Sequence, residues 1–211
     1  MDRFKSIHSG ETALLVGNGN NLHLTPPTGF DYPSFGMNTI HRYEGWKPTY
    51  YVAVDQRIWR DFGSEIDVKY NDVPKFVPRP HLDMWQGDNF HRFYHKPNEL
   101  WDERVVWDVD NLQDGFAYHS VMHAAMQLAA FMGFTTLLMI GVEHKPGHGR
   151  EHFWGEDLKM PGILPTHDWF RGYAYLVKRM REHGITVLNL SENTYVDEAT
   201  LPRGDWRNYA N

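Results

Sequence analysis

The residues best suited to chemistry lie in a glycine-rich turn near the N-terminus, Val16-Gly17-Asn18-Gly19-Asn20-Asn21-Leu22. The apolar run Ala13–Val16 precedes this turn, as expected of a buried strand. Glycine lets the main chain approach a ligand closely. Asparagine tolerates left-handed backbone and carries both a hydrogen-bond donor and an acceptor. The turn therefore suits a phosphate or a ribose, although a plain strand-to-helix connection has the same appearance.

The turn completes neither of the common nucleotide motifs. No third glycine follows at the position that a dinucleotide fingerprint requires, and no Gly-Lys-Ser/Thr sequence follows as in a P-loop. Taken alone, the turn leaves a nucleotide cradle and an ordinary connection equally open.

Polar side chains also follow three other apolar runs. Asn38 ends Phe35-Gly36-Met37-Asn38, Asp55 ends a run of tyrosine and valine, and Glu143-His144 follow a third run. Ligands of open parallel sheets bind outside the carboxyl ends of the strands, so these groups are candidates for one site. The carboxylate of Asp55 suits a ribose hydroxyl or a magnesium ion. The alternatives are caps for Asn38 and Asp55, and a solvated loop for Glu143-His144.

Two further candidates lie near the starts of predicted helices. The hydroxyl of Ser120 and the free N–H groups beside it suit a phosphate, with a simple helix cap as the alternative. His167 is able, as a neutral ring, to take a proton from an acceptor hydroxyl. Its alternative is a first-turn helix residue without chemistry.

Short apolar runs with little alternation predict strands that are covered on both faces. The strongest are Thr12–Val16, Tyr50–Val54, Arg104–Trp107, Thr136–Ile140 and Ile185–Leu190, and Phe35–Asn38 and Lys75–Val77 are weaker.

Two helices are predicted, one from Phe116 or Ser120 to Met132 and one from about Asp168 to His183. Each is followed by a glycine and then by an apolar strand, which is typical of βαβ crossovers. The sequence thus predicts one α/β domain over residues 1–211, Rossmann-like, with a mainly parallel sheet and helices on both faces. The segment of about 145–165, rich in Pro and Gly, is predicted to form a lid.

Composition limits the classes of partner. The 211 residues carry a net charge of −6, which argues against a general nucleic-acid binder. Cysteine is absent, which excludes disulfides and fits a cytoplasmic protein. We find no signal-peptide core and no apolar run long enough to span a membrane. The oligomeric state stays open.

Several stretches resemble the bacterial sialyltransferases and the related MptE-like family, which includes a 6-hydroxymethylpterin diphosphokinase. Val16–Leu22 resembles their Gly-Asn-Gly-Pro-Ser-Leu opening. Ser120–Phe134 resembles their small-residue helix, Leu138–His144 their Leu-Ile-Gly-Val-Asp-His strand end, and Gly184–Ser191 their last core strand. The order along the chain is the same, and together these segments cover most of it.

The resemblance implies a Rossmann-like fold and a site for a nucleotide or nucleotide-sugar. Its nucleotide-binding residues would be Gly17, Asn18, Gly19, Asn20, Asn38, Ser120, Glu143 and His144. His167 matches the general base of the sialyltransferases. The lid tyrosines of that group have no counterpart here, and Lys145 or Arg150 would meet the departing phosphate instead.

The resemblance also contains departures and alternatives. Asn20-Asn21 replaces Pro-Ser, and Glu143 replaces aspartate. The first interpretation is a glycosyltransferase-like enzyme with a small-molecule or glycan acceptor and no obligatory cofactor. The second is a diphosphokinase of the MptE-like type, in which Asp55 would bind Mg²⁺. The third is a nucleotide-binding module without catalysis.

Overall fold

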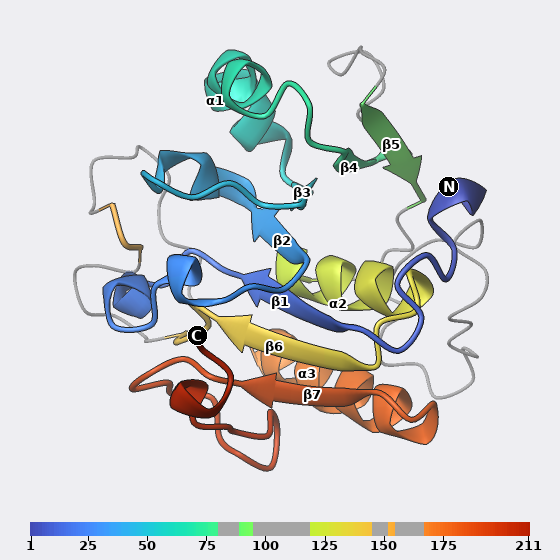
Figure 1. Ribbon diagram of the computed structural model, residues 1–211, viewed down its shortest axis with the longest axis vertical. Coiled ribbons are helices and arrows are strands. Elements are labelled where there is room, and N and C mark those ends of the chain that lie inside the picture. The colour runs from blue at the N-terminus through green and yellow to red at the C-terminus, as the bar shows by residue number, and fades with distance from the viewer. Residues whose placement is uncertain (80–88, 95–118, 145–151, 155–166) are drawn as a thin grey trace.

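The computed structural model describes residues 1–79, 89–94, 119–144, 152–154 and 167–211. In these residues seven parallel strands form one sheet in the order β5-β4-β3-β2-β1-β6-β7 (Figure 1). The strands are β1 (Thr12–Val16), β2 (Ser34–Met37), β3 (Tyr50–Val52), β4 (Lys75–Pro78), β5 (Phe90–Phe93), β6 (Thr136–Ile140) and β7 (Thr186–Asn189).

The strand order reverses beside β1. The chain first builds outward from β1 through β2, β3, β4 and β5, and then returns so that β6 pairs with the other side of β1. The register pairs Leu14 with Leu138 and Val16 with Ile140, so β1 and β6 end level with each other. This is the topological switch point at which open parallel sheets bind ligands.

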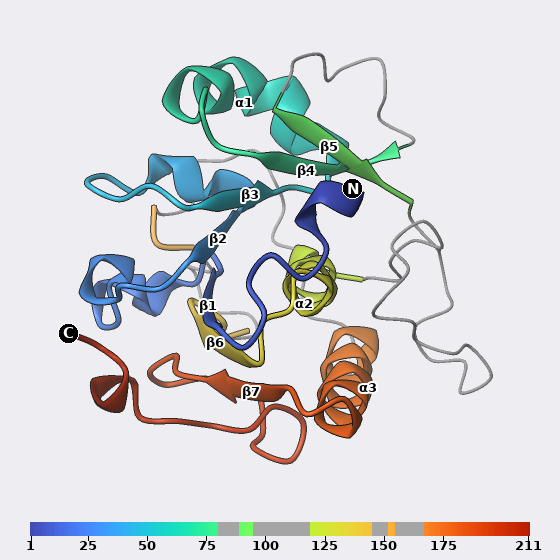
Figure 2. The same cartoon turned by 45° about the vertical axis from the view of Figure 1, so that its right-hand side comes forward.

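Helices cover both faces of the sheet. Helix α1 (Gln56–Lys69) packs on one face, and α2 (Val121–Phe131) and α3 (His167–Glu182) pack on the other (Figure 2). Alternate residues of β1 divide between the two cores, because Leu14 faces the side of α1 and Leu15 the side of α2. The predicted α/β Rossmann-like fold, with helices on both faces, is therefore confirmed.

The helices owe their form to their apolar patterns. In α1 the buried residues Ile58, Trp59, Phe62 and Ile66 form one stripe, as expected of a helix with one wet face. In α2 every residue after Val121 is buried, since this helix packs on the sheet with α3 beside it. Short 3₁₀ helices are η1 (Asp2–Phe4), η2 (Asn20–His23), η3 (Pro27–Gly29), η4 (Asn38–Arg42) and η7 (Trp206–Asn208). Within the described ranges no helix is long and apolar enough to cross a membrane.

Most predicted elements are present. The bounds of β1 and β6 agree with the prediction, those of β2, β3, β4 and β7 differ by one or two residues, and both predicted helices form. Helix α1 and strand β5 were not predicted. The predicted strand Arg104–Trp107, and the proposed lid apart from residues 152–154, lie outside the described residues.

Candidate functional site

Backbone hydrogen bonds join the ends of β1 and β6. The N–H of Gly17 donates to the Ile140 carbonyl at 2.9 Å, and the N–H of Gly19 donates to the Gly141 carbonyl at 3.0 Å. A Cβ on Gly17 would lie 2.4 Å from the Gly141 carbonyl oxygen, and Gly141 itself has a φ of +67°. The two glycines are therefore required by the contact of two strand ends, a reason that the sequence did not reveal.

Glu143 lies against this turn and is buried. A Cβ on Gly19 would lie 1.7 Å from the Glu143 Oε2 atom, and Glu143 is only 5% exposed. Burial raises the pKa of Glu143 to about 7, although the backbone N–H groups of Asn20 and Asn21 hydrogen-bond to the carboxyl and lower it. Its Oε1 atom has no hydrogen-bond partner among the described residues. The solvated-loop alternative for Glu143 is thus wrong.

Two asparagines lie at the neighbouring strand ends. The Asn18 amide donates to the carbonyl of Met37 at 3.0 Å, and Met37 directly precedes Asn38. Asn38 has a φ of +47°, and its carbonyl accepts a hydrogen bond from the hydroxyl of Tyr51. The Asn38 side chain makes no capping bond, because η4 is capped at Met37 without a side-chain bond. The Oδ1 atoms of both asparagines are buried without a partner in the described residues.

Three neighbouring strands of the sheet, β2, β1 and β6, thus each end near a buried oxygen that has no hydrogen bond within the described residues. These oxygens are Asn18 Oδ1, Asn38 Oδ1 and Glu143 Oε1. Buried polar atoms in folded proteins almost always have a partner, and an unpaired one is costly. All three can act as acceptors, so a ligand that satisfied them would bring hydrogen-bond donors.

A second polar cluster joins the residues after β6 to the N-cap of α2 and the second turn of α3. His144 has a φ of +48°, and its Nε2 atom lies 2.9 Å from the hydroxyl of Tyr173. Ser120 also hydrogen-bonds to that hydroxyl, and its Oγ atom accepts the N–H of His123 at 3.4 Å as the cap of α2. Burial lowers the pKa of His144 to about 4, so the ring is neutral at pH 7.

The aromatic surroundings of His144 explain its burial. Its ring contacts those of Trp169 and Phe170 edge-on, and it also packs against Tyr173. Tyr173 fits the apolar stripe of α3, so the sequence indicated a core residue only. The hydroxyl of Tyr173 is nevertheless the atom that links His144 to Ser120, and no sequence signal marked it.

Asp55 is held by its own helix. Its carboxylate caps α1 by accepting the backbone N–H of Arg57 at 2.8 Å, and it also accepts the Arg57 Nε–H at 2.9 Å. No group of three His, Cys, Asp or Glu side chains able to hold a metal ion occurs in the part of the chain that the structure describes. The capping alternative is the one observed for Asp55, and its part in binding magnesium stays a prediction.

The described part of the predicted lid touches the glycine-rich turn. His152 forms an isolated bridge with Gly19, and the N–H of Phe153 donates to the carbonyl of Asn18 at 3.2 Å. The Phe153 ring packs against Tyr43. Lys145 and Arg150 lie outside the described residues.

His167 is the first residue of α3. Because a crossover helix runs antiparallel to the strands it joins, α3 begins at the same edge of the sheet as the glycine-rich turn. The role of His167 stays a prediction.

The fold is shared with glycosyltransferases of known structure. One is the MAf glycosyltransferase from Magnetospirillum magneticum AMB-1, with a TM-score of 0.55, 11% identity, and coverage of 97% of this chain and 37% of that one. The other is the sialyltransferase CstII from Campylobacter jejuni, solved in complex with a substrate analogue, cytidine-5′-monophosphate. It has a TM-score of 0.54 and 12% identity, and the match covers 89% of this chain and 82% of CstII.

These likenesses define a glycosyltransferase-like α/β fold. This chain spans just over a third of the MAf protein. The sequence matches no protein-family profile and no curated protein. The predicted resemblance to the sialyltransferases is thus confirmed at the level of the fold, and the MptE-like specificity stays a prediction.

Proposed function

We propose that this protein is a nucleotide-binding transferase of the glycosyltransferase-like type, which uses a nucleotide-activated sugar donor. The observation that carries the proposal is the group of three buried oxygens at the carboxyl ends of β2, β1 and β6, on Asn38, Asn18 and Glu143, which have no partner in the part of the chain that the structure describes. The fold that the chain shares with two glycosyltransferases supports it.

Hydrogen-bond acceptors at this edge favour the nucleoside part of the ligand. Ribose hydroxyls and the exocyclic amino group of a base are donors, and they would pair with the amide and carboxyl oxygens. Phosphate oxygens are acceptors and need N–H or O–H groups instead. The free backbone N–H groups in the first turn of α2 would supply such donors at the same edge of the sheet.

The chemistry that follows is the transfer of a sugar to an acceptor hydroxyl. The acceptor oxygen forms a bond to the anomeric carbon, the bond from that carbon to the nucleotide phosphate breaks, and the acceptor proton goes to a base. His167 would receive this proton. Lys145 and Arg150 would stabilise the charge on the departing phosphate.

The test compares nucleotide binding after removal of the side chain at two asparagines, each of which has a left-handed backbone conformation. Asn38→Gly removes the amide but keeps the backbone conformation, and Asn193→Gly does the same at an exposed position with a φ of +53°. Binding of cytidine, uridine, guanosine and adenosine monophosphates would be measured by calorimetry in the presence of EDTA. We expect one nucleotide to bind the wild type, and its Kd to rise about tenfold in Asn38→Gly and to stay unchanged in Asn193→Gly.

Three other outcomes would contradict parts of the proposal. Absence of binding by every nucleotide up to millimolar concentration would contradict the nucleotide site. Binding without turnover of the corresponding nucleotide-sugars would indicate a binding module without catalysis. Binding of a nucleoside triphosphate only with Mg²⁺ would indicate diphosphoryl transfer in place of sugar transfer.

A further inference from the structure

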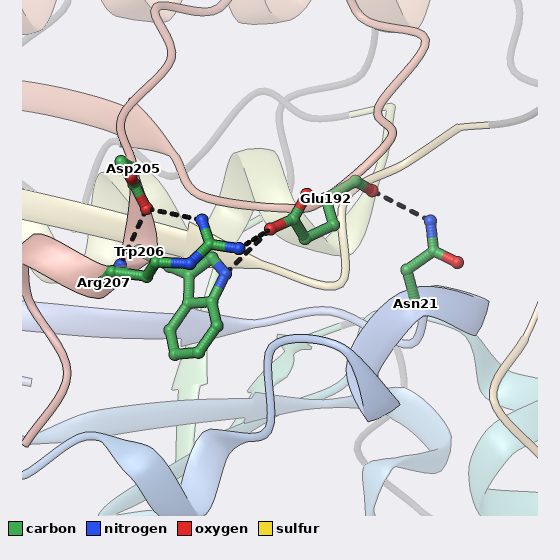
Figure 3. Close-up of polar contacts among 5 residues, drawn as sticks. All are labelled: Asn21, Glu192, Asp205, Trp206 and Arg207. Carbon is green, nitrogen blue, oxygen red and sulfur yellow. Dashed lines mark hydrogen bonds and ion pairs between the residues drawn. The ribbon is translucent and has the colours of Figure 1, made fainter.

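The C-terminal segment is tied to the residue that follows the last strand. In Figure 3 the side chains of Trp206 and Arg207 both reach the carboxylate of Glu192. The indole Nε1–H of Trp206 donates to Glu192 Oε1 at 2.9 Å, and the Arg207 guanidinium donates to the same oxygen at 3.2 Å. Asp205 in turn accepts from Arg207 at 3.0 Å and caps η7. Glu192 is therefore held from the C-terminal side.

Glu192 also holds the glycine-rich turn. Its backbone carbonyl accepts a hydrogen bond from the Asn21 side-chain amide at 2.9 Å (Figure 3). Asn21 lies in η2, and its backbone N–H is one of the two that bond to the Glu143 carboxyl. A continuous series of contacts thus leads from Trp206 through Glu192 and Asn21 to Glu143.

The two residues that donate to the Glu192 carboxylate, Trp206 and Arg207, differ in their burial. The side chain of Arg207 is 63% exposed, so solvent and salt screen its ion pair with Glu192. Trp206 is half-buried and packs against the core cluster on the α1 face. A fixed ring with a charge-assisted hydrogen bond gives the Glu192 side chain a defined position. Trp206 is therefore the stronger anchor.

We propose that Trp206 and Glu192 are positioning residues for the nucleotide, because they fix Asn21 and thereby the N–H groups that hold Glu143. This inference rests on the proposed function. The contacts of Trp206 and Glu192 act on the part of the site that would hold the nucleoside, whereas His167 would act on the acceptor. Loss of these contacts changes the nucleotide affinity and KM and leaves kcat unchanged.

The experiment compares Trp206→Phe and Glu192→Ala with Tyr209→Phe. Trp206→Phe removes the indole N–H and keeps an aromatic ring, and Tyr209→Phe changes the same short C-terminal segment outside the contacts to Glu192. Amide hydrogen exchange would be followed at Asn20 and Asn21 without nucleotide, with β6 amides as the internal reference for global stability. We expect about tenfold faster exchange in Trp206→Phe and Glu192→Ala, unchanged exchange in β6, and wild-type behaviour in Tyr209→Phe.

Nucleotide Kd, measured on the same variants, completes the test. We expect about a tenfold rise for Trp206→Phe and less than a threefold rise for Arg207→Gln. The double variant Trp206→Phe/Asn21→Ala should bind no more weakly than Asn21→Ala alone, since both changes break one series of contacts.

Two failures are distinguishable. If the wild type binds a nucleotide and both Trp206→Phe and Glu192→Ala bind it with unchanged Kd, the positioning role is wrong and the proposed function stands. If the wild type binds no nucleotide, the proposed function and the link to nucleotide affinity fail together. Hydrogen exchange then decides by itself whether the C-terminal segment orders the turn.

Discussion

The strand ends of this sheet differ in whether their polar side chains have hydrogen-bond partners. After β3, the carboxylate of Asp55 is paired with the N–H and the guanidinium of Arg57, two residues away. After β1 and β6, the oxygens Asn18 Oδ1 and Glu143 Oε1 are buried without a partner in the described ranges. Asp55, after β3, caps the helix that follows it. Asn18 and Glu143 each keep an oxygen that could still accept a hydrogen bond.

The comparison shows what separates a cap from a candidate ligand group. Both regions have a polar residue at the carboxyl end of a buried strand, so position in the fold does not distinguish them. The difference lies in whether a partner is available within the next few residues. Arg57 supplies one for Asp55, and the glycines around Asn18 supply none.

The largest effect in this comparison is expected from a methyl group at the contact of β1 with β6. Gly17→Ala sets a Cβ against the Gly141 carbonyl, and both atoms belong to fixed backbone, so the strands must separate. We expect the free energy of unfolding to fall by about 3 kcal/mol, measured by urea denaturation.

The control for Gly17→Ala lies in α1. A Cβ at Gly63 would meet the Trp59 side chain at 3.5 Å, an ordinary contact. Gly63→Ala should therefore raise the stability by up to about 1 kcal/mol through helix propensity. Equal effects of the two substitutions would refute the constraint on the strand ends.

An intermediate effect on the free energy of unfolding is expected from a change at Glu143, and the size of this effect depends on pH. The ordinary pKa of the side chain is 4.5, and burial raises it to about 7 in the folded state. Between these values the folded state binds more protons than the unfolded state. The stability that this group contributes is complete below pH 4.5 and is lost as the pH rises through 7.

Glu143→Gln removes this pH dependence. At pH 8 the variant should be more stable than the wild type by about 2 kcal/mol, and the difference should vanish near pH 4.5. Thermal denaturation between pH 4.5 and 8 measures the effect, with the exposed Glu198→Gln as the control for the loss of one charge. A difference that does not vary with pH would show that Glu143 titrates as an ordinary carboxyl.

The smallest effect is expected from Asp55. Asp55→Ala removes the cap of α1 and should cost about 1 kcal/mol of stability, whereas Asp55→Asn keeps a capping oxygen and should cost less. Nucleotide affinity should change less than twofold in both. A large loss of magnesium-dependent nucleotide binding in Asp55→Asn would instead support a metal site after β3.

The sequence predicts the elements that are buried on both faces. β1 and β6 are continuous apolar runs, so their bounds follow from composition alone. β5 reads Phe-His-Arg-Phe and lies at the edge of the sheet, where polar side chains remain solvated and weaken the signal. Helix α1 carries a clear apolar stripe, but Gly63 and many charged residues interrupt it.

The candidate site was predictable in position and only partly in composition. Strand ends marked Asn18, Asn38 and Glu143, because parallel strands bring their carboxyl ends to one edge. The contacts of Gly19 with Glu143 and of Asn21 with Glu192 join residues more than 120 positions apart. No local pattern encodes such contacts, so the C-terminal anchor Trp206 could not be found from the sequence.

The pairing of β1 with β6 also has a consequence for how the protein is made. β1 is synthesised before its neighbour β6, which follows about 120 residues later. Closing so large a loop is slow, and the first third of the chain exposes apolar strands until it happens. A nascent chain that does not yet include β6 and Glu192 has no complete switch point and no bond from Asn21 to the Glu192 carbonyl. The proposed nucleotide would therefore bind, and protect from proteolysis, only those chains in which β1, β6 and Glu192 have come together.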